Sequence, residues 1–404
     1  MAKGRDKYQI SSLIAPVFIP SALFSTGEYA LVPMIPASAE ALGASIPQAA
    51  IIAGFVMIGT VIADIPAARV VNRLGERKSM LFSAAAAALG ILVAVLGKNI
   101  WLLASGVLVV GFAAAVFALA RHAYLAETVP FEQRARAISI LGGMFRLGSF
   151  IGPMLAAGVI YLFDVDAVFW LSAGAMVLSM LVLVFSRLNN DGRVEELQTA
   201  TIRQILWRER KKLLTVGVGS SIVGMLRTTR VVGLPLWALT IGLPPAQTAL
   251  YIGIAAALDF ALFYTSGQIM DKFGRVWSAV PTLIGLGVAH MVVGLAHDAT
   301  GFLWLCLVMA LANGLGSGLI LVLGADLAPA DARNEFLGGY RVLVDGAVAV
   351  SSPLLSWFTV LTGSVASAMS AFGVLGILGA LLMWRYIPQF VPKPTSRAKD
   401  SAQT

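Results

Sequence analysis

Charged residues are scarce in this sequence: Asp, Glu, Lys and Arg make up 12% of its 404 residues, whereas apolar residues make up 58%. Soluble domains carry about a quarter of their residues as charged side chains. So few charges cannot cover a surface that faces water, which excludes an ordinary soluble fold. Lipid must therefore be the solvent for much of the chain.

Cysteine and histidine are also rare, and their scarcity excludes several kinds of site. The single cysteine, Cys306, lies in an apolar run, so the chain can form no internal disulfide and no thiolate metal cluster. The three histidines, His122, His290 and His297, show no metal-ligand spacing. We therefore expect no metal and no cofactor.

Several sequence patterns that would indicate other functions are missing. No segment reads Gly-x-x-x-x-Gly-Lys-Ser/Thr, so we do not expect ATP as an energy source. No Ser–His or His-rich catalytic spacing lies in the apolar segments, so we do not expect an intramembrane enzyme. The first apolar segment is longer than the core of a signal peptide and lacks a small-residue cleavage site, so it should be the first membrane helix.

Long apolar segments dominate what is present. Each can cross a hydrocarbon core of about 30 Å, which takes about 20 helical residues. The segments are 10–36, 48–68, 79–97, 100–126, 137–163, 167–186, 213–240, 247–270, 276–296, 300–325, 336–362 and 365–387. The sequence thus predicts an all-α membrane protein with twelve transmembrane helices. The polar stretch after the sixth segment should contain a short surface helix at 202–207.

One stretch of charge and glycine occurs twice. The first copy is 68–77 and the second is 267–275, and their corresponding positions are 199 residues apart. The same offset relates other pairs along the chain, such as Pro36 and Pro235. Repeated matches at one offset indicate an internal duplication. We therefore expect two pseudo-symmetric six-helix halves at 1–186 and 213–387, a cytoplasmic linker at 187–212 and a disordered cytoplasmic tail at 388–404.

The basic residues are distributed unevenly over the loops. Of the 29 Lys and Arg residues, five lie well inside apolar segments, and Lys98 alone lies in an odd-numbered loop. The other 23 lie at the termini, in the even-numbered loops or at their edges, and they include Arg385 near the end of the last segment. Such an excess marks the cytoplasmic side, so both termini should be cytoplasmic and a nucleic-acid partner is not expected.

The repeated stretch resembles the cytoplasmic signature of the major facilitator superfamily, and the chain is similar to twelve-span transporters of its drug:proton antiporter group. The resemblance implies two halves around a central cavity and a charge latch at the cytoplasmic gate. The first copy departs from the signature because Asn72 stands where the family has an aspartate, so its latch should be weaker or depend on Asp64. The expected gate residues are Asp64, Asn72, Arg73, Gly75, Gly267, Asp271, Lys272, Gly274 and Arg275.

A second resemblance lies in the fifth apolar segment. Gly148, Gly152 and Pro153 are similar to the antiporter motif of the family, although alanines replace its last two glycines. The motif is typical of exporters that exchange substrate for protons, but small residues at this spacing also serve plain helix packing. Arg121 lies where the family often has an arginine linked to proton transfer.

Ionisable residues inside membrane helices are costly, so each needs a reason. Glu28 and Arg227 occupy equivalent places in the two halves, and Arg230 lies one turn beyond Arg227. We expect Glu28 and Arg227 to face the same cavity, with Asp259 as a partner for either arginine. Glu28 is the first candidate for proton coupling because a carboxyl group can take up and release a proton as its surroundings change. The alternative is a permanent Glu–Arg ion pair that holds the halves together.

Other polar residues in the spans have simpler alternatives. Arg146 and Asn313 are candidates for the substrate cavity, beside Arg227 and Arg230, but Arg146 could pair with an acid and Asn313 could serve a helix crossing. Asp259 and Arg121 complete the proton-coupling candidates. Arg341 and Asp345 are spaced for a local ion pair.

An acid–proline–arginine pattern ends the fourth and tenth spans. It reads Glu127, Pro130 and Arg134 in the first half, and Asp326 to Arg333 is its counterpart in the second. Proline ends the helix, and the acid–arginine pair can bridge the helix ends. We interpret both copies as structural parts of the gate.

Taken together, these features predict a secondary active transporter, a proton-coupled efflux antiporter of small amphipathic or organic molecules. The alternative is a proton-coupled importer of a small anionic or zwitterionic solute, which Arg227 and Arg230 favour. The expected partners are a small-molecule substrate, protons and the lipid bilayer. The expected location is the inner cell membrane, with the protein a monomer.

Overall fold

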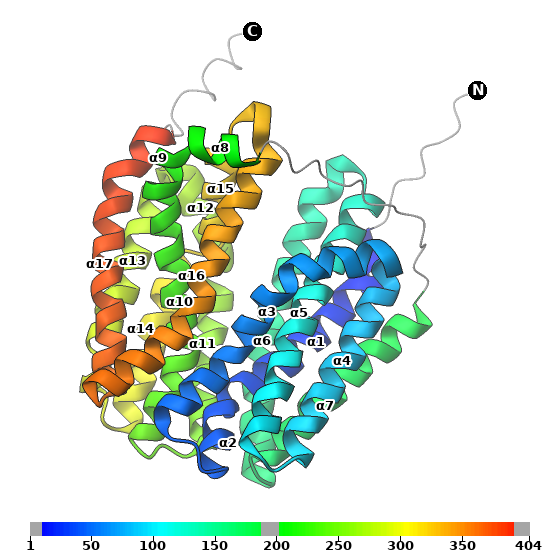
Figure 1. Cartoon of the computed structure of the whole chain (residues 1–404), viewed down its shortest axis with the longest axis vertical. Helices are drawn as coiled ribbons and strands as arrows, with labels where there is room; N and C mark the ends of the chain where they lie inside the picture. The colour runs from blue at the N-terminus through cyan, green and yellow to red at the C-terminus, as the bar shows by residue number, and fades with distance from the viewer. Residues whose placement is uncertain (1–9, 187–201, 392–404) are drawn as a thin grey trace. The chain divides into compact units, whose positions relative to one another are not determined.

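The computed structural model describes residues 10–186 and 202–391. Every regular element in these two ranges is a helix. Contacts between residues divide the chain into two compact units. Figure 1 colours the chain by residue number, from blue at the N-terminus to red at the C-terminus. The first unit holds the described residues before 187 together with Pro245–Gly253, and the second holds the rest.

The first unit is built from seven helices and the start of an eighth. They are α1 (Ile19–Leu31), α2 (Ile35–Ala41), α3 (Ile46–Leu74), α4 (Glu76–Leu96), α5 (Ile100–Thr128), α6 (Phe131–Leu162), α7 (Asp166–Phe185) and the first half of α11 (Pro245–Ala261). A 3-10 turn and a π-helical turn precede α1, and a further 3-10 turn joins α1 to α2.

The second unit contains the remaining helices. They are α8 (Ile202–Arg208), α9 (Arg210–Lys212), α10 (Val218–Thr240), the second half of α11, α12 (Phe263–Phe273), α13 (Val276–Met291), α14 (Ala299–Leu315), α15 (Leu319–Leu327), α16 (Arg333–Thr362) and α17 (Val365–Phe390). The expected helix at 202–207 is present as α8.

The described residues contain eleven helical segments that are long and apolar enough to cross a membrane, and α13 is a shorter apolar helix beside them. The chain is therefore an all-α, multi-pass membrane protein, as the composition predicted. The expected ninth span, 276–296, is too long: its α-helix ends at Met291, and a 3-10 turn at Val293–Leu295 follows.

The expected end of the last span is also corrected. We expected the tail to begin at Pro388, but α17 continues to Phe390 with Pro388 inside it. A proline in the last turn removes only one backbone hydrogen bond, so the helix tolerates it. The disorder expected for the rest of the tail concerns residues 392–404, outside the described residues, as does most of the expected linker.

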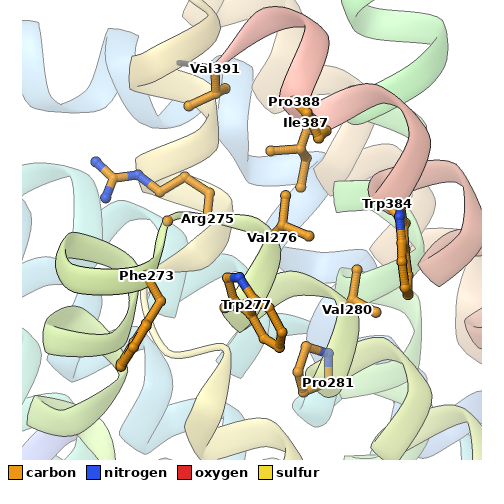
Figure 2. Close-up of a pocket in the computed structure, with 11 residues that line it drawn as sticks. Phe273, Arg275, Val276, Trp277, Val280, Pro281, Trp384, Ile387, Pro388 and Val391 are labelled. Atoms are coloured by element: carbon orange, nitrogen blue, oxygen red, sulfur yellow. The ribbon is translucent and has the colours of Figure 1, made fainter. Parts of the chain in front are cut away.

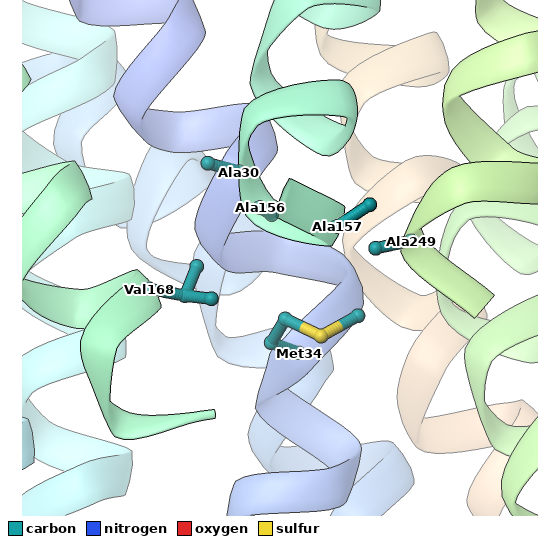
Figure 3. Close-up of a cluster of buried hydrophobic side chains, with 6 residues drawn as sticks. All are labelled: Ala30, Met34, Ala156, Ala157, Val168 and Ala249. Carbon is teal, nitrogen blue, oxygen red and sulfur yellow. The ribbon is translucent and has the colours of Figure 1, made fainter. Parts of the chain in front are cut away.

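Small side chains fill the core where α1, α6 and α7 meet. Figure 3 shows that Ala30 of α1 and Met34 of the 3-10 turn after it lie beside Ala156 and Ala157 of α6, with Val168 of α7 and Ala249 of α11 next to them. All six are buried. Small residues let helix backbones approach closely in lipid, where packing rather than the hydrophobic effect holds helices together.

The short helix α8 is attached to the rest of the second unit by an ion pair. The Arg208 guanidinium donates two hydrogen bonds, of 2.8 and 3.0 Å, to the Asp331 carboxylate. These hydrogen bonds lower the pKa of Asp331 and raise that of Arg208. Leu206 packs so closely against Gly339 of α16 that a Cβ at that glycine would overlap it. The pair therefore stays charged at neutral pH and links α8 to the turn before α16, while Leu206 packs against α16 itself.

Candidate functional site

Glu28 lies in α1 beside a basic group of α5. Its carboxylate interacts electrostatically with the guanidinium of Arg121, which is only 8% exposed. One turn before each of these residues lies a phenylalanine: Phe24 and Phe117 stack with their ring centres 4.4 Å apart, and Arg121 lies 5.8 Å from the centre of the Phe117 ring. The structure thus brings together two of the three expected proton-coupling residues, in one apolar setting within the first unit.

The antiporter-like motif determines how closely α6 approaches the Glu28 segment. A Cβ at Gly148 would lie 2.5 Å from Ser25 Cβ, and one at Gly152 would lie 2.5 Å from the carbonyl oxygen of Thr26. Both glycines therefore permit backbone contact between α6 and α1, and Pro153 follows directly inside α6. The motif packs against the part of α1 that carries Glu28. It therefore serves helix packing, and it also lies next to a candidate for proton coupling.

A second polar cluster lies within the second unit. The Arg230 guanidinium forms an ion pair of 3.2 Å with Asp259, and it also donates a hydrogen bond of 3.2 Å to the carbonyl oxygen of Met309. The Asn313 side-chain amide donates a hydrogen bond to the same Asp259 oxygen. Asp259 and Asn313 are buried. The expected partnership of Asp259 with one of the two arginines is present, and Arg230 is the partner.

The helix that carries Asn313 is interrupted directly after it. Helix α14 ends at Leu315 and α15 begins at Leu319, with Gly318 between them at a φ of +75°. Such a φ favours glycine because it has no Cβ. The Arg227 guanidinium donates a hydrogen bond of 2.7 Å to the carbonyl oxygen of Gly316.

Two serines satisfy the other carbonyl groups at this break. Ser278 of α13 donates a hydrogen bond of 2.6 Å to the carbonyl oxygen of Leu315, and Ser266 of α12 donates to that carbonyl and to that of Ser317. In lipid every backbone polar group needs an internal partner. Side chains from three different helices therefore make the break possible.

The expected gate motif of the second unit is organised by Arg275. Its side chain donates a hydrogen bond of 2.8 Å to Asp326 at the end of α15 and one of 3.2 Å to Asp271. Burial by itself would lower the pKa of Arg275, but its hydrogen bonds with Asp326 and Asp271 raise it above the ordinary value. Gly274 precedes Arg275 with a φ of +95°, so a glycine is required at this turn.

This geometry gives Asp326 a partner outside its own acid–proline–arginine pattern. The sequence suggested that the acid and arginine of the pattern can bridge helix ends, and the described contact of Asp326 is with Arg275, 51 residues earlier. The Asp271 side chain is 82% exposed and that of Asp326 is 28% exposed, so Asp326 is the better-buried partner.

The corresponding turn of the first unit has an acid in the place of Arg275. At the offset of 199 residues, Glu76 stands for Arg275 and Glu127 stands for Asp326, and these two acids lie within electrostatic reach of each other. Gly75 keeps the positive φ, at +77°. Asn72 and Arg73 are exposed in the last turn of α3. The Asp64 side chain lies outside the described residues, so its proposed latch role stays a prediction.

The remaining candidates differ in their exposure. Arg146 is half-buried on α6, Gly267 has no close neighbour that would exclude a side chain, and Lys272 is exposed. Arg341 forms the expected local ion pair with Asp345, at 3.1 Å. The shared cavity of Glu28 and Arg227 stays a prediction, because these residues belong to different units.

Sequence reasoning missed the two serines at the α14–α15 break and the acid in the place of Arg275 at the first gate turn. The serines carry no signal in the sequence, because membrane helices contain many of them. The acid was detectable: the offset of 199 residues already aligned Arg275 with Glu76.

Substitutions at the two gate turns should slow transport to different extents. We expect Asp326→Asn to slow transport more than Asp271→Asn, because Asp326 is the less exposed partner of Arg275. Asn72→Ala should have the smallest effect, since Asn72 cannot form an ion pair. The measurement is the initial transport rate at equal amounts of protein in the membrane. Equal rates for all three variants would contradict the asymmetry of the gate.

A family model with the description "Major Facilitator Superfamily" matches residues 17–351. The chain belongs to the Major Facilitator Superfamily. This finding confirms the resemblance seen in the motifs.

Known members of the superfamily are distant relatives. The class B tetracycline resistance protein of Escherichia coli is 25% identical over 300 residues, which is 70% of this chain and 72% of that protein. Sugar efflux transporter A of Escherichia coli strain K12 is 23% identical over 245 residues, 60% of either chain. An uncharacterized MFS-type transporter of Mycobacterium tuberculosis is 24% identical over 300 residues, but the match spans only 43% of its length and 69% of this chain.

Solved structures of the superfamily share the fold. A POT family transporter in complex with 5-aminolevulinic acid has a TM-score of 0.79 and 13% sequence identity, covering 96% of this chain and 98% of that one. At this identity the likeness concerns the fold and carries no information on cargo.

Proposed function

We propose that this transporter is a proton-coupled exporter, which exchanges protons for small amphipathic or organic molecules by alternating access. The observation that carries the proposal is the Glu28–Arg121 pair inside the membrane-spanning part of the first unit. An acid beside a buried guanidinium can hold its charge in one state and accept a proton when the surroundings change.

The direction of transport rests on the relatives and on the motif in α6. One relative is named for sugar efflux and another for tetracycline resistance. Gly148 and Gly152, similar to the antiporter motif, pack against the segment of α1 that contains Glu28. Both observations favour export over import.

The cargo argument rests on how the arginines of the second unit are engaged. Arg230 is bound to Asp259, and Arg227 donates a hydrogen bond to a backbone carbonyl group. The Asp259 carboxylate compensates the charge of Arg230, so the two arginines together offer less positive charge to an anionic cargo than the sequence suggested. We therefore favour neutral or amphipathic molecules over the small anions of the alternative. We place the protein in the inner cell membrane as a monomer with cytoplasmic termini.

Vesicles that hold a proton gradient test this function. Inside-out vesicles carrying the protein receive a panel of lipophilic cations, neutral antibiotics and organic anions, and the lumenal pH is recorded. We expect one class of neutral or cationic compounds to dissipate the gradient, and vesicles without the protein to show no response. Proton entry with an organic anion in right-side-out vesicles, and no response in inside-out vesicles, would instead establish the importer.

A further inference from the structure

An apolar pocket lies at one end of the second unit, beside the turn that carries Arg275. It has a volume of about 290 Å³ and lies between the turn at Gly274, the start of α13 and the last turns of α17. Figure 2 shows Trp277 and Trp384 on two sides of it, with Val280 and Pro281 between them, and the Arg275 guanidinium directed away from these rings. The pocket is thus a place for an apolar group.

The two tryptophans face outward from membrane helices. Trp277 is 66% exposed and Trp384 is 65% exposed, although each lies within a turn or two of the end of its helix. Tryptophan is enriched where membrane helices meet the headgroup region, because its ring is apolar and its N–H is polar. Two tryptophans beside an apolar pocket can accommodate a lipid. Its acyl chain would enter the pocket, and its headgroup would lie at the rim.

One basic side chain at the rim suits an anionic headgroup. The Lys272 ammonium lies 5.3 Å from the ring centre of Phe273, which lines the pocket. The described ion pairs of the nearby acids, Asp271 and Asp326, are both with Arg275. The Lys272 ammonium is outside these ion pairs and can therefore contact an anionic group.

The segment that follows the pocket in the sequence is also basic. The residues after Val391, the last that lines the pocket, include Lys393, Arg397 and Lys399 and a single acid, Asp400. Such basic segments next to a membrane helix attract anionic lipids. The segment is also too polar to fill an apolar pocket itself, so a lipid is the better occupant.

We propose that this pocket binds an anionic phospholipid of the cytoplasmic leaflet. One acyl chain lies against Trp277 and Trp384, and the phosphate contacts Lys272. The positive-inside rule places this basic end of the spans on the cytoplasmic side, where anionic lipids face the protein.

Tryptophan quenching tests the position of the lipid. A variant that keeps only Trp277 and Trp384 is reconstituted with phosphatidylglycerol or phosphatidylcholine brominated on the acyl chains. We expect several-fold stronger quenching by the brominated phosphatidylglycerol at equal mole fraction. A variant that keeps only Trp304 and Trp357, which are exposed elsewhere in the second unit, should be quenched equally by both lipids. Equal quenching of Trp277 and Trp384 by both lipids would overturn the proposal.

Native mass spectrometry of the protein with all its tryptophans gives an independent measurement. The purified protein should retain phosphatidylglycerol in preference to phosphatidylcholine, and Lys272→Gln should reduce this preference roughly fivefold, the effect of one basic side chain at an anionic surface. Lys98→Gln, at a different surface pocket, is the matched control and should change nothing. An equal loss in both variants would overturn the proposal. So would a preference that appears only after residues 392–404 are removed, which would assign the pocket to the chain's own tail.

Discussion

Glu28→Gln should reduce proton movement driven by substrate to the level of vesicles without the protein. Glutamine keeps the size of the side chain but cannot take up or release a proton at neutral pH, so the coupling step is lost. The substitution also leaves Arg121 without the carboxylate with which it interacts. The measurement is the collapse of a proton gradient on addition of substrate to inside-out vesicles.

A second readout separates loss of coupling from loss of structure. Exchange of labelled for unlabelled substrate needs no net proton transfer, so it should continue in Glu28→Gln while gradient collapse is lost. Glu40→Gln is the matched control, because Glu40 is an exposed carboxyl group at the end of the same apolar segment. Gradient collapse at the wild-type rate in Glu28→Gln would exclude Glu28 as the proton carrier, and loss of both activities with a lowered unfolding temperature would indicate a structural ion pair.

The second large effect should come from Asp259→Ala. This change removes the carboxylate from the cluster and leaves Arg230 without an acid partner in a setting where the Arg230 side chain is only 16% exposed. Breaking one side of a buried ion pair costs about 3–5 kcal/mol of unfolding free energy. We expect a clear fall in the thermal unfolding temperature of the purified protein, accompanied by loss of transport.

A double variant tests whether the unpaired charge causes the fall. Replacing both groups, Asp259→Ala with Arg230→Leu, should recover much of the lost stability, because no uncompensated charge remains. Asp345→Ala is the control: its partner Arg341 is 71% exposed, and exposed pairs contribute at most about 1 kcal/mol. A double variant as unstable as Asp259→Ala alone would show that the cluster stabilises the unit in another way.

The fold could be predicted from the sequence because the membrane imposes a strong condition on it. A helix must hold about 20 apolar residues to cross the hydrocarbon core, so the spans appear as long uncharged runs. The offset of 199 residues that aligns Asp271 with Asn72 indicated the internal duplication. The same reasoning found Asp259 as a partner for an arginine, because a charge in a span must be compensated there.

Partners that are far apart in the sequence were harder to predict. Arg275 is four residues after Asp271, a spacing at which side chains can form a local ion pair. The closer partner of Arg275 is Asp326, which comes near it only when α15 packs beside the turn after α12. The motif at Gly148 and Gly152 likewise suggested close packing without saying which helix would be contacted. The sequence reveals the need for a partner, and the fold decides which residue supplies it.

The interruption between α14 and α15 has a consequence for how this chain can evolve. Its carbonyl groups are satisfied by Arg227, Ser266 and Ser278, which lie on three separate helices. The Leu315 carbonyl group accepts hydrogen bonds from both serines, and the Gly316 carbonyl group also accepts one from the Leu319 N–H. The Ser317 carbonyl group has Ser266 as its described donor, so loss of Ser266 leaves a carbonyl group unsatisfied in apolar surroundings, which is costly in lipid. Descendants of this gene should therefore keep Ser266 more strictly than Ser278 or Arg227.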